Sequence, residues 1–109
     1  MIPIPKRLLI HNCTHKTLIG EDDYGKPAYS KPVELKNVRI EPSSAVVTDK
    51  QNRQKQLSAL LIYDCRNSKG LTEFKTEDVI GFEDTEYTVG RVDRLYDGRK
   101  LHHYEVGLI

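Results

Sequence analysis

The stretch LSALLIYD, residues 57–64, is the strongest indication of fold class in this chain. In an extended strand its apolar side chains fall on both faces, with Leu57, Ala59, Leu61 and Tyr63 on one face and Leu60 and Ile62 on the other. A short run that is apolar on both faces is typical of a central strand that is covered on two sides. We therefore expect a β strand in the middle of a sheet.

The preceding segment, SSAVVTDKQNRQKQ (residues 43–56), has the opposite character. Residues 48–56 include no apolar side chain, so a helix here would have no apolar face to bury and would be marginal in water. We predict a long mobile loop over residues 43–56, and loops of this length in compact domains are usually functional or disordered. We expect Val46 and Val47, at its start, to pack when a partner is present.

Two strands are predicted before this loop. Residues 6–17 form the first, with Leu8 and Ile10 on its buried face, and residues 20–32 (GEDDYGKPAYSKP) form a loop or an open hairpin. The apolar residues of the next strand, which begins at Val33, change parity at Asn37, so we expect a β-bulge there. Pro42 ends that strand, because proline cannot donate to a β ladder.

The second half of the chain also reads as short strands. We predict a turn at residues 66–70, one helical turn at residues 76–78, a strand at residues 79–82 and a bulge near Gly90. Asp97-Gly98 is a hairpin turn signal before the last strand. The predicted core is Leu8, Ile10, Val38, Ile40, Leu61, Tyr63, Val89, Val106 and Leu108. Together these patterns predict one all-β domain, residues 1–109: a small barrel or compact sandwich of five or six strands with at most one helical turn.

Composition excludes several classes of protein. Hydrophobic residues make up 38% and charged residues 30% of the 109 positions, which fits neither a membrane protein nor a disordered tail. The longest apolar runs cannot span a bilayer, and MIPIPKRLLI lacks the pattern of a signal peptide. We therefore expect synthesis in a cytoplasm, no membrane partner, and reduced Cys13 and Cys65.

Charge is uneven along the chain although the net charge is only +1. A basic segment contains Lys50, Arg53, Lys55, Arg66 and Lys69, and an acidic segment contains Glu73, Glu77, Asp78, Glu83, Asp84 and Glu86. Solvated loops are the simpler interpretation. The alternative places the two segments on opposite faces, which would suit head-to-tail packing of identical subunits.

The sequence contains no motif that indicates an enzyme. Phosphate loops, a GxSxG elbow and HExxH are all absent, and neither acidic pair, residues 77–78 or 83–84, has a nucleophile beside it. Cys13 with His15, or His102 with Asp97, could bind a metal, but their spacing is not that of a structural zinc site. We predict no catalytic residue, no metal and no cofactor. We expect adjacent His102 and His103 to point to opposite sheet faces, one buried and one solvated.

Nucleic-acid binding is the main alternative from a different functional class. Small β barrels bind single strands through aromatic residues on a sheet face and basic side chains. Lys50, Arg53 and Lys55 could contact phosphates without reading sequence. Three such contacts would give a log–log salt slope of about −2 to −3, which predicts weak and nonspecific binding.

Several longer runs carry a family resemblance: MIPIPKRLLIHN, GEDDYGKPAY, ELKNVRIEPSS, LSALLIYDCRNS and YTVGRVDRLYDGRKLHHYEVGLI. Together they cover nearly the whole chain, and LHHYEVGLI is the most distinctive. In these runs the chain resembles the small minor capsid proteins encoded in head–tail gene clusters of tailed phages and prophages of Gram-positive bacteria.

This resemblance implies a structural virion protein of the phage neck. It implies a small β barrel that assembles as a homo-oligomeric ring between portal or adaptor proteins and a tail-completion protein. The polar loop would then help retain packaged double-stranded DNA, with Lys50, Gln51, Arg53, Gln54 and Lys55 as the residues facing the channel. The terminal apolar residues are candidates for subunit contacts: Met1, Ile2, Ile4, Leu108 and Ile109. A head–tail adaptor, a tail-completion protein and a tail terminator remain open alternatives.

Overall fold

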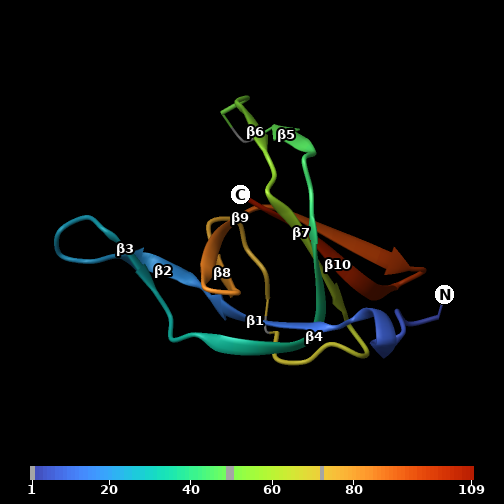
Figure 1. Ribbon diagram of the computed structural model, residues 1–109. Coiled ribbons are helices and arrows are strands. Elements are labelled where there is room, and N and C mark those ends of the chain that lie inside the picture. Colours follow the sequence, from blue (N-terminus) through green and yellow to red (C-terminus); the bar gives the residue numbers. More distant parts are fainter. Residues whose placement is uncertain (1, 49–50, 72) are drawn as a thin grey trace.

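The strands form a closed barrel from which two hairpins project (Figure 1). The computed structural model describes residues 2–48, 51–71 and 73–109, without the side chain of Val47. The barrel has the order β1-β4-β7-β10-β9-β8, and β8 pairs back to β1, so the sheet closes. Its strands are β1 (His11–Lys16), β4 (Val33–Pro42), β7 (Ala59–Asp64), β8 (Val79–Phe82), β9 (Thr85–Asp97) and β10 (Lys100–Leu108). The all-β prediction is confirmed, and the barrel is the form it takes.

Each projecting hairpin is inserted between two barrel strands. The first, β2 (Leu18–Glu21) with β3 (Pro27–Tyr29), lies between β1 and β4 and is called the β2–β3 arm. The second, β5 (Val46–Thr48) with β6 (Gln54–Gln56), lies between β4 and β7 and is called the β5–β6 arm. Among the residues that the structure describes, the strands of each arm pair only with each other. The first arm confirms the open hairpin among the two options predicted there.

The β5–β6 arm corrects the prediction of a loop over residues 43–56. Val46 pairs with Gln56 and Thr48 pairs with Gln54, so the polar segment is a two-stranded ribbon. Absence of an apolar stripe argues against a helix, but a hairpin ladder can satisfy its backbone groups without a buried face. The polar composition therefore excluded the helix and did not exclude the ribbon.

Strand β7 has a hydrogen-bonded neighbour on each side, as LSALLIYD predicts. It lies between β4 and β10, and Leu57 and the inward residues of β7 are buried: Ala59, Leu61 and Tyr63. Leu60 and Ile62 on the outer face are only half-buried. A small closed barrel fills its interior with side chains, whereas its outer face needs a second layer to be covered. The predicted burial of the inner face of β7 is confirmed, whereas its outer face is only half-buried.

Both predicted bulges are present. The pairing of β4 with β1 shifts beside Asn37, which has a φ of +57°. On β9, Gly90 is the extra residue opposite the step from Gly107 to Leu108 on β10. Each extra residue restores the inward parity of the apolar side chains beyond it, which is why the change in sequence parity located the bulges.

Most of the predicted core is confirmed, and the exception lies near the N-terminus. Seven of the nine predicted core residues are buried: Val38, Ile40, Leu61, Tyr63, Val89, Val106 and Leu108. The prediction that Leu8 and Ile10 belong to the core was wrong, because their side chains are 43% and 65% exposed. Leu9 between them is the buried residue. A 3₁₀ turn, η1 (Lys6–Leu8), precedes the strand, so β1 begins only at His11 and the alternation assumed from residue 6 does not apply.

The connection between β7 and β8 supplies a core residue from outside the strands. Phe74 is 1% exposed and packs edge-to-face against Tyr63 and Tyr104. The helical turn predicted at residues 76–78 is instead a hydrogen-bonded turn, in which the Asp78 N–H donates to Lys75 O at 3.3 Å. Within the described ranges η1 is the sole helical turn, and no helix there is long and apolar enough to cross a membrane.

Candidate functional site

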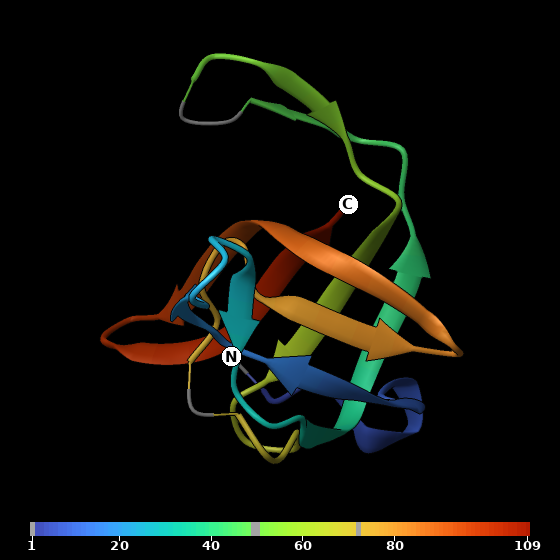
Figure 2. The ribbon, with the colours of Figure 1, turned by 90° about the vertical axis from the view of Figure 1, so that its left-hand side faces the viewer.

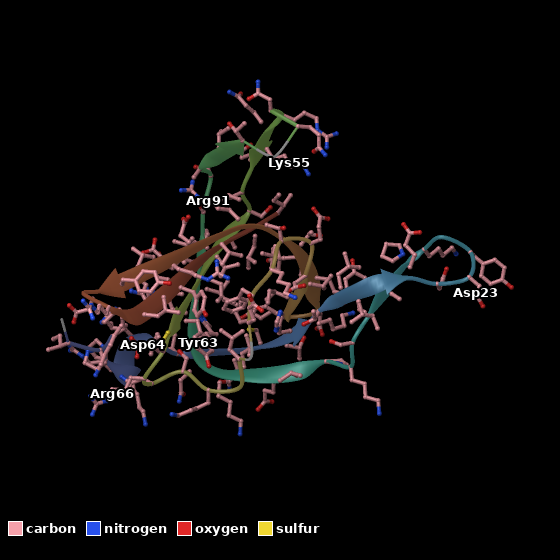
Figure 3. All side chains as sticks on the ribbon, turned by 180° about the vertical axis from the view of Figure 1, so that it is seen from behind. Asp23, Lys55, Tyr63, Asp64, Arg66 and Arg91 are labelled. Atoms are coloured by element: carbon pink, nitrogen blue, oxygen red, sulfur yellow. The ribbon has the colours of Figure 1, made fainter. Side chains whose placement is uncertain are left out.

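The β5–β6 arm carries the residues proposed to face a DNA channel. Gln51, Arg53, Gln54 and Lys55 are exposed there, while Lys50 lies outside the described residues. Arg53 Nη2 donates to Gln51 Oε1 at 3.1 Å, and Lys55 is labelled on the arm in Figure 3. The structure therefore brings the four described candidates together on one ribbon.

This arm arches over the end of the barrel at which the chain terminates (Figure 2). A cleft of about 440 Å³ lies between the arm and the barrel rim, lined by Arg53 and Lys55 from the arm and by Thr76, Glu77 and Gly90 from the rim. The side chains that line this cleft include two basic residues and one carboxylate, that of Glu77, so the described lining is net positive. The ribbon can thus present positive charge to a partner that lies beyond the barrel end.

The β2–β3 arm was not predicted as a site, and its tip is an ordered turn. Asp22 Oδ1 accepts hydrogen bonds from the backbone N–H groups of Tyr24 at 2.8 Å and Lys26 at 2.9 Å. Tyr24 next to this turn is 89% exposed. The sequence signal that could have found it is the run Glu-Asp-Asp-Tyr-Gly, in which an aromatic residue stands in a polar turn.

A buried carboxylate fastens the base of the β2–β3 arm to the barrel. Asp78 is 0% exposed; its Oδ1 accepts from the Leu18 N–H at 3.1 Å, and its Oδ2 accepts from the Lys75 N–H at 2.9 Å. His15 Nε2 lies 2.9 Å from the same Oδ2. Interpretation of the pair Glu77-Asp78 as a solvated loop was therefore wrong for Asp78. Two of its three partners, Leu18 and His15, are 60 and 63 residues away in the sequence, which sequence spacing does not show.

A second buried carboxylate fastens the N-terminal segment, residues 2–10. Asp64 is 1% exposed, and its Oδ1 accepts from the Ile4 N–H at 3.1 Å. Asn67 Nδ2 donates to the Ile4 carbonyl at 2.7 Å. Among the proposed subunit-contact residues here, Ile2 is 80% exposed, Ile4 is half-buried and Met1 lies outside the described residues.

The C-terminal contact candidates differ from each other. Leu108 is fully buried and paired with Ala59 and Val89 inside the barrel, so its side chain is not available to a neighbour. Ile109 is half-buried, and its backbone exchanges hydrogen bonds with Thr88 at 2.9 and 3.1 Å. Leu108 is therefore a core residue, and of this pair only Ile109 remains a contact candidate.

His102 and His103 contact each other, contrary to the expectation of opposite faces. His102 is the bulged residue of β10, and a bulge re-aims the side chain it carries. Their Nδ1 atoms are 2.8 Å apart; His102 Nε2 lies 2.6 Å from the Ile2 carbonyl, and His103 Nε2 lies 3.0 Å from Glu105 Oε2. The contact of His102 Nε2 with the Ile2 carbonyl joins the N-terminal segment to β10.

The structure divides both charged segments of the sequence. Arg53 and Lys55 lie on the β5–β6 arm, whereas Arg66 lies at the end of the barrel where the N-terminal segment is fastened (Figure 3). Of the acidic residues, Asp78 is buried, while Glu83 and Asp84 form the exposed turn between β8 and β9. The two segments therefore do not form two opposite faces.

The proposed metal-ligand pairs do not gather further ligands in the part of the chain that the structure describes. Among those residues no group of three or more His, Cys, Asp or Glu side chains is placed to hold a metal ion. His15 Nε2 is hydrogen-bonded to Asp78 Oδ2. Burial raises the pKa of the Cys13 thiol to about 12. A buried thiol of this kind is a small hydrophobe at neutral pH.

Comparison with known proteins identifies the family. No curated protein and no solved structure matches this chain. A family model described as minor capsid protein matches residues 5–108, which covers the barrel and both arms. The chain therefore belongs to the minor capsid protein family of phages.

Proposed function

We propose that this protein is a component of the phage neck, a stopper-like head-completion protein. In this role it forms a ring on the portal or adaptor side, helps retain packaged DNA and joins the tail. Family membership supports a structural protein of the phage particle. The observation that carries the finer role is the β5–β6 arm, a polar and basic ribbon that leaves the barrel and is exposed along its described length.

The charge of the arm suits weak contact with duplex DNA. Arg53 and Lys55 are exposed on it, and Lys50 belongs to the same segment. One subunit with three phosphate contacts would bind weakly, with a log–log salt slope of about −2 to −3. A ring presents one arm per subunit, so the weak contacts add without any tight grip by a single chain. That combination supports retention of DNA that must later be released.

Deletion of the gene from the phage or prophage that carries it tests the neck role. We expect heads and finished tails lying apart in negative-stain electron micrographs of the induced lysate, with emptied heads if the stopper role is right. Full heads without finished tails would indicate tail completion instead. Normal infectious particles would overturn the neck role, and strong binding of the monomer to short DNA would then favour a nucleic-acid-binding module.

A charge-neutralised arm tests the DNA contact separately. We expect phage with K50Q, R53Q and K55Q to assemble complete particles that lose DNA faster on heating or at low salt. The matched control is K31Q, K36Q and K75Q, which removes the same charge from three exposed lysines outside this arm. Equal DNA loss from both variants would contradict a specific role for the arm.

A further inference from the structure

Large hydrophobic side chains that stay exposed gather on two segments of the described chain. On the N-terminal segment they are Ile2, Leu8 and Ile10; on the β2–β3 arm they are Ile19 and Tyr24. Val33, Val46 and Tyr96 are also exposed but stand on separate strands. Single exposed apolar residues are ordinary, whereas groups of them mark interaction surfaces.

These two segments lie at opposite ends of the long axis of the molecule. Figure 1 shows the β2–β3 arm at one side and η1 with the N-terminus at the other. Figure 3 shows the same separation, with Asp23 at the tip of the arm and Arg66 at the far end of the barrel. The longest extent of the molecule, 46 Å, exceeds the other two by about half. One copy therefore cannot bring its two apolar groups together.

The charges at the two ends have opposite sign. Three acids, Glu21, Asp22 and Asp23, stand at the arm tip with Lys26 as the base among them, and all four are exposed. At the other end Lys6, Arg7 and Arg66 are exposed, and the N-terminal segment is bonded to the turn that holds Arg66 through Asn67. Complementary charge around apolar contacts guides association and fixes register.

Both ends are held in place before any partner arrives. Asp78 fixes Leu18 at the arm base, Ser30 Oγ accepts from the Thr17 N–H at 3.0 Å, and Asp22 orders the tip. Asp64 fixes Ile4 at the other end. Preorganised elements lose less conformational entropy on binding, which favours a contact of modest area.

We propose that the tip of the β2–β3 arm of one copy docks on the N-terminal segment of the next copy, head to tail. Ile19 and Tyr24 pack on Leu8 and Ile10, while Glu21 and Asp23 face the basic residues of that end. A heterologous contact of this kind closes into a ring when the rotation permits. The proposal rests on the ring-forming role above and supplies the contact that would build the ring.

Cysteine cross-linking tests the pairing of the two ends. In a C65S background, Y24C and I10C are made singly and together, and Cys13 stays because it is buried. Oxidation of the mixed single variants is expected to give a disulfide-linked dimer, and the double variant is expected to give a ladder. Each single variant alone should stay monomeric on a denaturing gel. Dimers from one single variant alone would overturn the head-to-tail arrangement in favour of a two-fold one.

Comparison of two samples distinguishes failure of this contact from failure of the neck role. The variants are analysed both in purified phage particles and as concentrated free protein. Protein present in particles without the Tyr24–Ile10 cross-link overturns the contact and leaves the neck role standing. If the protein is absent from phage particles but the free protein gives the ladder, the contact stands and the neck role is overturned. No cross-link in either sample overturns the contact.

Charge reversal provides a second test with its own rescue. E21K with D23K, or K6E with R7E, is expected to weaken self-association about tenfold, because attraction becomes repulsion. Mixing the two reversed variants should restore association between unlike copies. The control E83K with D84K reverses the exposed acidic turn between β8 and β9 and should leave association unchanged. Failure of the mixture to recover would contradict pairing of these two ends.

Discussion

The barrel and the two arms follow different rules of stability. Every barrel strand has hydrogen-bonded neighbours on both sides and turns an apolar face inward, whereas each arm strand has one neighbour and no core. A two-stranded hairpin is at best marginally stable alone in water. The barrel therefore holds the fold, and the arms are the regions that contact with another molecule would stabilise most. Substitutions should separate the two regions clearly.

The largest effect should come from the aromatic side chain that fills the barrel. F74A is expected to lower the free energy of unfolding by about 3–5 kcal/mol, because it removes a fully buried ring and leaves a cavity. Urea unfolding followed by circular dichroism measures it. Y24A on the β2–β3 arm is the control and should change stability by less than about 0.5 kcal/mol. Similar losses from both would erase the distinction between barrel and arm.

Removal of either buried carboxylate should cost somewhat less. D78A leaves the N–H groups of Leu18 and Lys75 without their acceptor, and we expect a loss of about 2–4 kcal/mol. The change should also raise amide hydrogen exchange at the base of the β2–β3 arm more than on β10. D64A should do the same for residues near Ile4. Uniform exchange across the protein would mean that these carboxylates do not hold separate regions.

Two glycines with positive φ give a smaller and sharper contrast. At Gly70, with φ of +108°, an added Cβ would meet the Glu34 carbonyl oxygen at 2.2 Å. At Gly98, with φ of +62°, it would meet nothing within 4 Å. G98A should cost about 1 kcal/mol from backbone strain alone, and G70A should cost more because the backbone must also shift. Equal melting temperatures for the two variants would contradict the close approach of β4.

Thiol chemistry should separate the two cysteines without changing stability. Burial raises the pKa of Cys13 to about 12, and burial followed by the charge of Asp64 raises the pKa of Cys65. A raised pKa means less thiolate, so alkylation by iodoacetamide at pH 8 should be slow at exposed Cys65 and undetectable at Cys13 until unfolding. Mass spectrometry of the labelled peptides measures both rates. Rapid labelling of Cys13 in folded protein would place it outside the core.

Local sequence patterns predicted much of the barrel because its strands obey alternation. The central strand, both bulges, the end of β4 at Pro42 and the turn at Asp97-Gly98 could all be read from side-chain parity and turn residues. Leu8 and Ile10 were placed wrongly for the same reason. Alternation was extended through a 3₁₀ turn, whose period differs from that of a strand.

The candidate site was less predictable, because the contacts that build it join residues far apart in the sequence. Arg53 and Lys55 were found as a basic run, yet their place on a ribbon above the barrel was not. Asp64 and Asp78 bind the backbone N–H groups of Ile4 and Leu18, which are about 60 residues away, so no local pattern distinguishes these two carboxylates from exposed ones. Contacts of this range depend on the tertiary arrangement of the barrel and not on neighbours in the sequence.

Local sequence patterns are sufficient for the all-β class, for the inward residues of the barrel strands and for the places where the ladder bulges. These depend on alternation and turn chemistry, which act between near neighbours in the chain. The closure of β8 onto β1, the burial of Asp78 and Asp64 and the departure of two arms from the barrel follow only from the three-dimensional fold. Those features depend on pairings between residues far apart in the chain, whose free energy no local pattern contains.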